Sequence, residues 1–103
     1  MTEKPQTLGD LAPHLGLDAH AVPDIPLEGV TEDSRRAGRG YAFVATVGEH
    51  VDGHGFAEQA AAAGARVILG EREGISELAG LPYVRVPHAR VALGAAAHAL
   101  AGA

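Results

Sequence analysis

The spacing of apolar residues predicts a helix near the start of the chain, followed by a loop. Three leucines within residues 8–15 fall on one helical face, and Thr7 before them suits the N-cap. Gly16 supplies a natural end to this helix. Residues 17–28 contain two prolines and three acidic side chains, which is typical of a connecting loop.

The middle of the chain predicts a strand–helix–strand unit. Residues 30–32 and the nearly continuous apolar run 42–47 predict two strands, the second typical of a sheet interior. A helix is expected over residues 56–63, with Gly64 in the left-handed region at its end. Residues 66–69 follow at once as a buried strand. Because such short connections join them, we expect a βαβ unit and a sheet that is at least partly parallel.

The last third of the chain predicts one more strand and a terminal helix. Residues 71–80 are expected to form a charged surface segment with one helical turn at residues 75–79, and residues 83–86 to form a strand. The expected packing face of the terminal helix is Leu93, Ala96, Ala97 and Leu100. Residues 1–103 are therefore expected to form a single small α/β domain, with a mixed or partly parallel sheet of about four or five strands flanked by helices.

Composition narrows the classes of function. The 103 residues include no cysteine, which excludes disulfides and thiolate chemistry. Thirteen acidic and eight basic residues give a formal charge of −5, and this argues against nucleic-acid binding, which needs a basic face. No run approaches the roughly 18 apolar residues of a membrane span, and the charged N-terminus does not resemble a signal peptide. We therefore expect a soluble, cytoplasmic protein.

His50, Asp52 and His54 form the sharpest local cluster of side chains with coordinating atoms. Three ligands at alternate positions are able to bind zinc when a fourth is supplied, but none is evident nearby. Two neighbouring glycines indicate a loop rather than a strand. The favoured interpretation is that Asp52 caps the helix that begins near Phe56 while His54 lies on the surface, and no metal site is expected.

Asp33-Ser34-Arg35 lies in the turn between the first two expected strands. No sequence feature supplies the base and oxyanion hole of a serine nucleophile, so a catalytic role is not expected. In one interpretation Asp33 and Arg35 pair to fix the turn, while the Ser34 hydroxyl hydrogen-bonds a ligand or a neighbouring amide. In the other, the segment is a purely structural turn. The residues alone leave both interpretations open.

Arg35, Arg36 and Arg39 form a small basic patch in an otherwise acidic chain. Guanidinium groups suit phosphates, although a solvated turn is the commoner role of such clusters. A Walker-type ATP loop is excluded, because it needs a lysine directly after its last glycine and Lys4 is the only lysine. Two short strands that end in polar, glycine-containing loops are still able to aim backbone N–H groups and side chains at one ligand.

Several segments together resemble the N-terminal domain of the Mur ligases, the ATP-dependent enzymes that build the peptide stem of bacterial peptidoglycan. The matching segments are Gly29-Val30-Thr31-x-Asp33-Ser34-Arg35, Gly40-x-x-Phe43-Val44-Ala45 and Gly48-x-x-x-Asp52-Gly53-His54-x-Phe56, then Gly64-Ala65 and Arg90-Val91-Ala92-Leu93. The similarity covers nearly the whole chain from about Leu8. Tyr41-Ala42 and Glu49-His50 depart from the residues that are usual in the family.

The resemblance implies that the chain holds the UDP end of a nucleotide-sugar substrate. Carried over to this sequence, the family's UDP contacts fall at Glu32, Ser34, Glu49, His50 and Val51. The Asp-Ser-Arg form is most similar to the ligase that adds diaminopimelate or L-lysine, as the third stem residue, to UDP-N-acetylmuramoyl-L-alanyl-D-glutamate. One alternative is the ligase that adds the terminal D-Ala-D-Ala dipeptide. Another is a non-enzymatic interaction domain whose partner face is the alanine-rich helix.

The resemblance also implies that ATP and Mg²⁺ act in other domains of a parent ligase, joined to this one in the same polypeptide. No catalytic residue, metal site or cofactor is expected within residues 1–103. These residues alone are not expected to catalyse a reaction.

Overall fold

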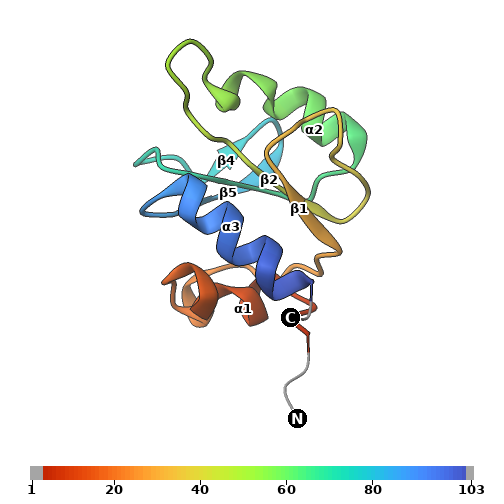
Figure 1. Cartoon of the computed structure of the whole chain (residues 1–103), viewed down its shortest axis with the longest axis vertical. Coiled ribbons are helices and arrows are strands. Elements are labelled where there is room, and N and C mark those ends of the chain that lie inside the picture. The colour runs from red at the N-terminus through yellow and green to blue at the C-terminus, as the bar shows by residue number, and fades with distance from the viewer. Residues whose placement is uncertain (1–3, 102–103) are drawn as a thin grey trace.

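A computed structural model of the protein describes residues 4–101. The centre of this part of the chain is a sheet of five strands in the order β1-β2-β3-β5-β4, with helices on both faces (Figure 1). The strands are β1 (Gly29–Thr31), β2 (Tyr41–Val44), β3 (Val67–Gly70), β4 (Glu77–Leu78) and β5 (Leu81–Arg85). The predicted α/β fold with a mixed sheet is confirmed.

Most of the sheet is parallel. β1, β2, β3 and β5 share one direction, whereas β4 runs antiparallel along β5. The short 3₁₀ helix η3 (Gly53–Phe56) and α2 (Ala57–Ala63) join β2 to β3, which is the predicted βαβ unit. Residues 32–40 alone join β1 to β2 and contain no helix. Because β1 and β2 are parallel, their carboxyl ends lie at the same edge of the sheet.

The first helix begins where the sequence predicts. Thr7 forms a capping box with the residue three positions on, so two backbone N–H groups at the helix start are satisfied. α1 (Leu8–Leu11) continues as the 3₁₀ helix η1 (Ala12–Leu15), which ends at Gly16 with a φ of 73°. A second 3₁₀ turn, η2 (Ala19–Ala21), lies in the predicted loop.

Two hydrophobic clusters lie on opposite faces of the sheet. Because side chains alternate along a strand, Phe43 and Ile68 point towards α2, while Val44 and Leu69 point towards α1 and α3 (Ala89–Leu100). The α2-side cluster is Ala37, Phe43, Ala45, Ala57, Ala60, Ala65, Ile68 and Tyr83. The larger cluster on the other face contains the buried leucines of α1 and η1 and the buried alanines of α3. The domain therefore has three layers (Figure 1).

The predicted helical turn at residues 75–79 is wrong. β4 lies there and forms a hairpin with β5, with Leu78 opposite Leu81. The two residues that link them, Ala79 and Gly80, have φ values of 56° and 79°, as in the two-residue turns whose twist matches a hairpin. The sequence did not reveal this turn because alanine occupies the first central position, where asparagine or glycine is usual.

The packing face predicted for the terminal helix is only partly correct. The buried side chains of α3 are Ala89, Ala92, Ala96, Ala99 and Leu100, whereas Ala97 is exposed and Leu93 is half-buried. Alanines occur on several sides of this helix, so their spacing did not define its orientation. Within residues 4–101, every helix is too short or too polar to cross a membrane.

Gly64 ends α2 in a left-handed conformation, as predicted. Its φ is 113°, and a Cβ at this position would lie 2.8 Å from the backbone N and Cα of Arg39. The Gly40 N–H also donates a hydrogen bond to the Gly64 carbonyl at 3.1 Å. The end of α2 therefore supports the turn that leads into β2.

The two phenylalanines allow a matched test of this core. Phe43 is 0% exposed in β2, and we expect Phe43→Ala to lower the free energy of unfolding by about 3–5 kcal/mol. Phe56 is 44% exposed, and Phe56→Ala should change the free energy by at most about 0.5 kcal/mol. Urea denaturation followed by circular dichroism measures both changes. Equal losses in the two variants would contradict the assigned core.

Candidate functional site

A cleft of about 620 Å³ lies at the carboxyl ends of β1 and β2. It is formed by the turn after β1, the loop after β2 and the first residues of η3, α2 and α3. Its lining residues are Glu32, Asp33, Ser34, Arg35, Thr46, Gly48, Val51, Gly53, Phe56, Gln59 and Arg90. In open parallel sheets, ligands bind outside the carboxyl ends of the strands, so the position of this cleft is that of a ligand site.

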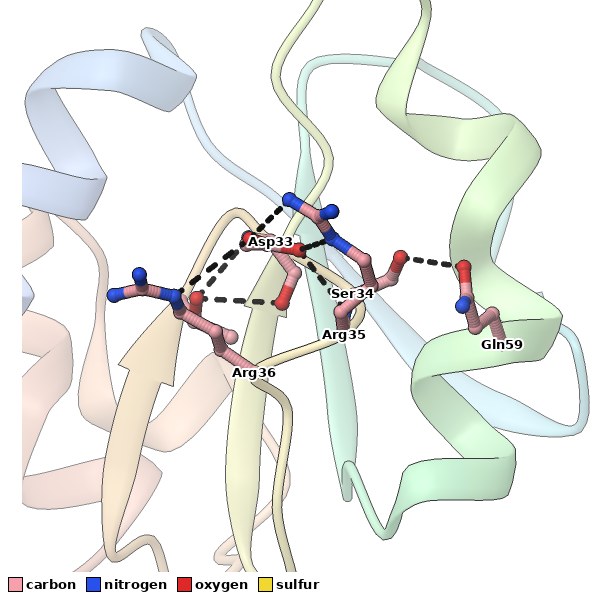
Figure 2. Close-up of polar contacts among 6 residues, drawn as sticks. Asp33, Ser34, Arg35, Arg36 and Gln59 are labelled. Atoms are coloured by element: carbon pink, nitrogen blue, oxygen red, sulfur yellow. Dashed lines mark hydrogen bonds and ion pairs between the residues drawn. The ribbon is translucent and has the colours of Figure 1, made fainter.

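The turn after β1 is fixed by one carboxylate (Figure 2). Asp33 accepts hydrogen bonds from the Arg35 backbone N–H at 3.0 Å and from the Arg35 guanidinium at 3.1 Å through each oxygen. Arg36 Nε lies 3.8 Å from the same carboxylate, and Thr31 Oγ1 accepts the Asp33 N–H at 3.0 Å. The hydrogen bonds from Arg35 lower the pKa of Asp33. The predicted pairing of Asp33 with Arg35 is confirmed.

Ser34 connects this turn to α2. Its side chain is almost fully buried, and its hydroxyl donates a hydrogen bond to Gln59 Oε1 at 2.8 Å (Figure 2). This partner is the side-chain amide of a residue 25 positions later. Ser34 and Gln59 therefore form one wall of the cleft, with hydrogen-bonding groups from two separate elements.

Arg90 lies on the opposite wall, in the first turn of α3. The first N–H of that helix, on Ala89, donates to the Glu71 carboxylate at 2.7 Å, which anchors the start of α3. Arg90 Nη1 lies 3.8 Å from Glu32 Oε1, and Thr46 Oγ1 donates to the same oxygen at 3.2 Å. Glu32 therefore links the ends of β1 and β2 to the start of α3.

The loop after β2 is closed by backbone contacts. Val47 and Asp52 form an isolated antiparallel bridge, and the Gly48 N–H donates to the Val51 carbonyl at 2.7 Å. The Gly53 N–H donates to the Thr46 carbonyl at 2.8 Å. A Cβ on Gly53 would lie 2.7 Å from that carbonyl oxygen, so only glycine permits this approach.

The predicted binding residues fall into two groups. Glu32, Ser34 and Val51 line the cleft together. Glu49 and His50 are exposed at the tip of the loop beside it and are not among the lining residues. The structure thus brings three of the five predicted residues into one cleft.

The Asp52–His54 segment differs from its predicted arrangement. Asp52 caps η3 by accepting the His54 N–H at 2.9 Å, so its predicted capping role is confirmed. His54 does not lie on the surface: it is buried, with Nδ1 2.6 Å from Asp52 Oδ1 and Nε2 2.7 Å from the Tyr83 hydroxyl. Within residues 4–101, no three histidine or acidic side chains are placed to hold a metal ion.

Eight of the eleven lining residues were not predicted as binding residues, among them Thr46, Phe56, Gln59 and Arg90. Thr46 lies in the loop after β2, whereas Phe56 ends η3 and Gln59 lies in the first turn of α2, so the positions of these two depend on the path of η3. Arg90 is 58 positions from Glu32 and reaches the cleft only because α3 packs across β1 and β2. The sequence signal that could have identified Arg90 is its position in the first turn of the helix that follows the last parallel strand.

Asp52 gives the domain a testable acid sensitivity. Hydrogen bonds from the His54 backbone and ring lower the pKa of Asp52 to about 2, from its usual value of 3.8. A carboxyl group whose pKa is lowered in the folded state stabilises the fold at pH values above its unfolded-state pKa. This stabilisation is lost as the pH falls towards the folded-state pKa. We therefore expect the free energy of unfolding to fall between pH 5 and pH 2 by less in Asp52→Asn than in the wild type. Urea titrations across this pH range measure the difference, and parallel losses would contradict it.

Comparisons with known proteins identify the family of the chain. The family model described as "Mur ligase family, catalytic domain" matches residues 26–101. A UDP-N-acetylmuramyl-tripeptide synthetase of Deinococcus radiodurans is 47% identical over an alignment of 98 positions, which covers 92% of this chain and 20% of that protein. A UDP-N-acetylmuramoyl-tripeptide–D-alanyl-D-alanine ligase of Escherichia coli is 42% identical over 69% of this chain and 15% of its own length.

Solved structures show the same fold. A crystal structure of MurF from Acinetobacter baumannii superposes with a TM-score of 0.70 and 31% identity, covering 88% of this chain and 20% of that one. The chain thus spans about one fifth of the length of the Deinococcus radiodurans synthetase and of this MurF. The family model covers most of the chain, and the Deinococcus radiodurans relative is 47% identical over an alignment that covers 92% of it. The chain belongs to the Mur ligase family.

Proposed function

We propose that this chain binds the uridine diphosphate end of a UDP-N-acetylmuramoyl-peptide. The proposed setting is a cytoplasmic, ATP-dependent ligase that adds the third residue, diaminopimelate or lysine, to UDP-N-acetylmuramoyl-L-alanyl-D-glutamate. The observation that carries the proposal is the cleft at the carboxyl ends of β1 and β2, which buried Ser34 and the cationic Arg90 both line. The chain is about one fifth of the related tripeptide synthetase, so the ligase activity is proposed for the longer protein.

The size and lining of the cleft suit a nucleotide. Its volume of about 620 Å³ falls within the usual range of small-ligand sites, about 300–1,000 Å³. Phe56 offers an exposed aromatic face for a base, and Ser34 and Gln59 offer hydrogen-bonding groups for the base or the ribose. In this arrangement the Glu32 carboxylate accepts a hydrogen bond from a ribose hydroxyl.

Two arginines, Arg35 and Arg90, are among the described residues that line the cleft, and Arg90 is the one available to bind the diphosphate. Arg35 is held by two hydrogen bonds to Asp33, so its guanidinium is already neutralised locally. Arg90 lies 3.8 Å from Glu32 in an exposed pair, and such pairs contribute little, about 0–1 kcal/mol. A diphosphate can therefore compete for Arg90, and its other oxygens can meet backbone amides of Glu49, His50 and Val51.

The residues present do not fit ATP or Mg²⁺. Lys4 is the only lysine of the chain and follows no glycine, so the phosphate-binding loop of an ATP site is missing from residues 1–103. We assign ATP and Mg²⁺ to the rest of the proposed ligase, and no chemical step to this chain. Its role is to anchor the far end of the substrate, because remote binding energy supports orientation at the reacting carboxylate.

A second candidate is the same module of a ligase that adds D-Ala-D-Ala. It is favoured by the similarity to the Escherichia coli D-alanyl-D-alanine ligase and to MurF from Acinetobacter baumannii. The full-length protein distinguishes the two, since incorporation of diaminopimelate or lysine into the UDP-dipeptide supports the first. Incorporation of D-Ala-D-Ala into a UDP-tripeptide supports the second. A non-enzymatic interaction domain would bind no UDP.

Titration of UDP tests the proposed binding directly. We expect chemical-shift changes at Ser34 and His50 in the wild-type chain. Arg90→Gln should weaken UDP binding about tenfold, because a hydrogen bond from a charged group contributes about 1.5–3 kcal/mol. Arg39→Gln is the matched control, since Arg39 lies at the other end of β2 and outside the cleft.

Two results would count against the proposal. One is the absence of any shift at millimolar UDP in both the 103-residue chain and the full-length protein. The other is an equal loss of affinity in Arg39→Gln and Arg90→Gln, since that would indicate a general charge effect.

A further inference from the structure

A chain of hydrogen bonds runs from Asp52, in the loop after β2, to the buried Tyr83 in β5. We call residues 46–53 the cleft loop. Asp52 Oδ1 lies 2.6 Å from His54 Nδ1, and His54 Nε2 lies 2.7 Å from the Tyr83 hydroxyl. The His54 and Tyr83 side chains are almost fully buried, and their rings stack with centroids 5.6 Å apart. The Tyr83 hydroxyl also accepts the Arg72 backbone N–H at 2.9 Å. None of these four residues lines the cleft. Gly53, which lies between Asp52 and His54 in the sequence, does line it.

One arrangement of protons satisfies every partner in this chain of contacts. Tyr83 receives one hydrogen bond from Arg72, and burial raises the pKa of Tyr83, so its hydroxyl keeps its proton. That proton is donated to His54 Nε2, which therefore accepts. Nδ1 then carries the histidine proton and donates it to the Asp52 carboxylate. A neutral histidine in this tautomer satisfies both contacts at once.

This chain holds the base of the cleft loop. Asp52 forms the bridge with Val47 that closes the loop, and Gly53 packs against the backbone of Thr46. Arg72 Nη2 contacts the free Asp52 oxygen at 2.8 Å from outside. Loss of the Tyr83 hydroxyl would leave a buried His54 nitrogen and the Arg72 N–H without their partner, which favours rearrangement of the segment.

We propose that His54 and Tyr83 are positioning residues for the cleft: by holding Asp52 and Gly53, they set the place of residues 46–53 at which the nucleotide binds. The inference rests on the proposed function, because the cleft is taken as the UDP site. His54 itself touches no ligand in this scheme. A merely structural role would lower the stability of the fold without changing the affinity of the folded protein.

Tyr83→Phe tests the proposal, because it removes the hydroxyl and keeps the ring. We expect UDP binding to weaken about tenfold, as for the loss of a buried hydrogen-bond partner. Amide hydrogen exchange of Gly48 and Gly53, which close the loop, should accelerate about tenfold, while the amides of α3 keep their rates. Tyr41→Phe is the matched control, since Tyr41 is the chain's other tyrosine and lies at the start of β2, away from the cleft. It should change affinity by at most about twofold.

The outcomes separate this inference from the proposed function. If wild type binds no UDP, the proposed function fails, and the exchange rates of Gly48 and Gly53 in Tyr83→Phe still decide the positioning role. The positioning role is overturned if the exchange rates of Gly48 and Gly53 are unchanged in Tyr83→Phe. It is also overturned if the folded variant binds UDP within about twofold of the wild-type affinity. If Tyr83→Phe does not fold, the ¹⁵N shifts of the wild-type His54 ring decide. A proton on Nδ1 at neutral pH supports the chain, and a proton on Nε2 overturns it.

Discussion

The parallel pairing of β1 with β2 is the constraint on which the candidate site depends. Val30 lies opposite Ala42, so the residues after both strands emerge side by side at one edge of the sheet. Because residues 32–40 join these strands without a helix, the space above their ends is not covered by a crossover helix. α2 lies on one face of the sheet and α3 on the other (Figure 1). Gln59 of α2 and Arg90 of α3 both line the cleft.

Much of this architecture could be predicted from the sequence, because strong local signals agree with the fold. The capping box at Thr7, the left-handed Gly64 and the apolar run of β2 all predicted elements that the structure contains. The hairpin of β4 and β5 was missed, because Ala79 adopts a positive φ that alanine rarely takes. The orientation of α3 was ambiguous for a different reason, since alanine on every side of a helix gives no contrast.

Some residues of the candidate site could be predicted from the sequence, and others could not. The turn at Asp33–Arg35 could be predicted because its contacts are local, within two residues. His54 was misplaced on the surface, because its burial depends on Tyr83, 29 positions later, and no short-range signal reveals that partner. Arg90 and Gln59 reach the cleft through the packing of whole helices. Side chains whose role depends on distant partners could not be placed by spacing alone.

Two adjacent residues outside the cleft contact segments that support it from two sides. Glu71 holds the first N–H of α3, and Arg72 contacts Asp52 and Tyr83 on the other side. The two residues are adjacent and directly follow β3. The segment after a central strand therefore contacts both the start of α3 and the base of the loop after β2. Residues that do not line the cleft thus support two of the segments that form it.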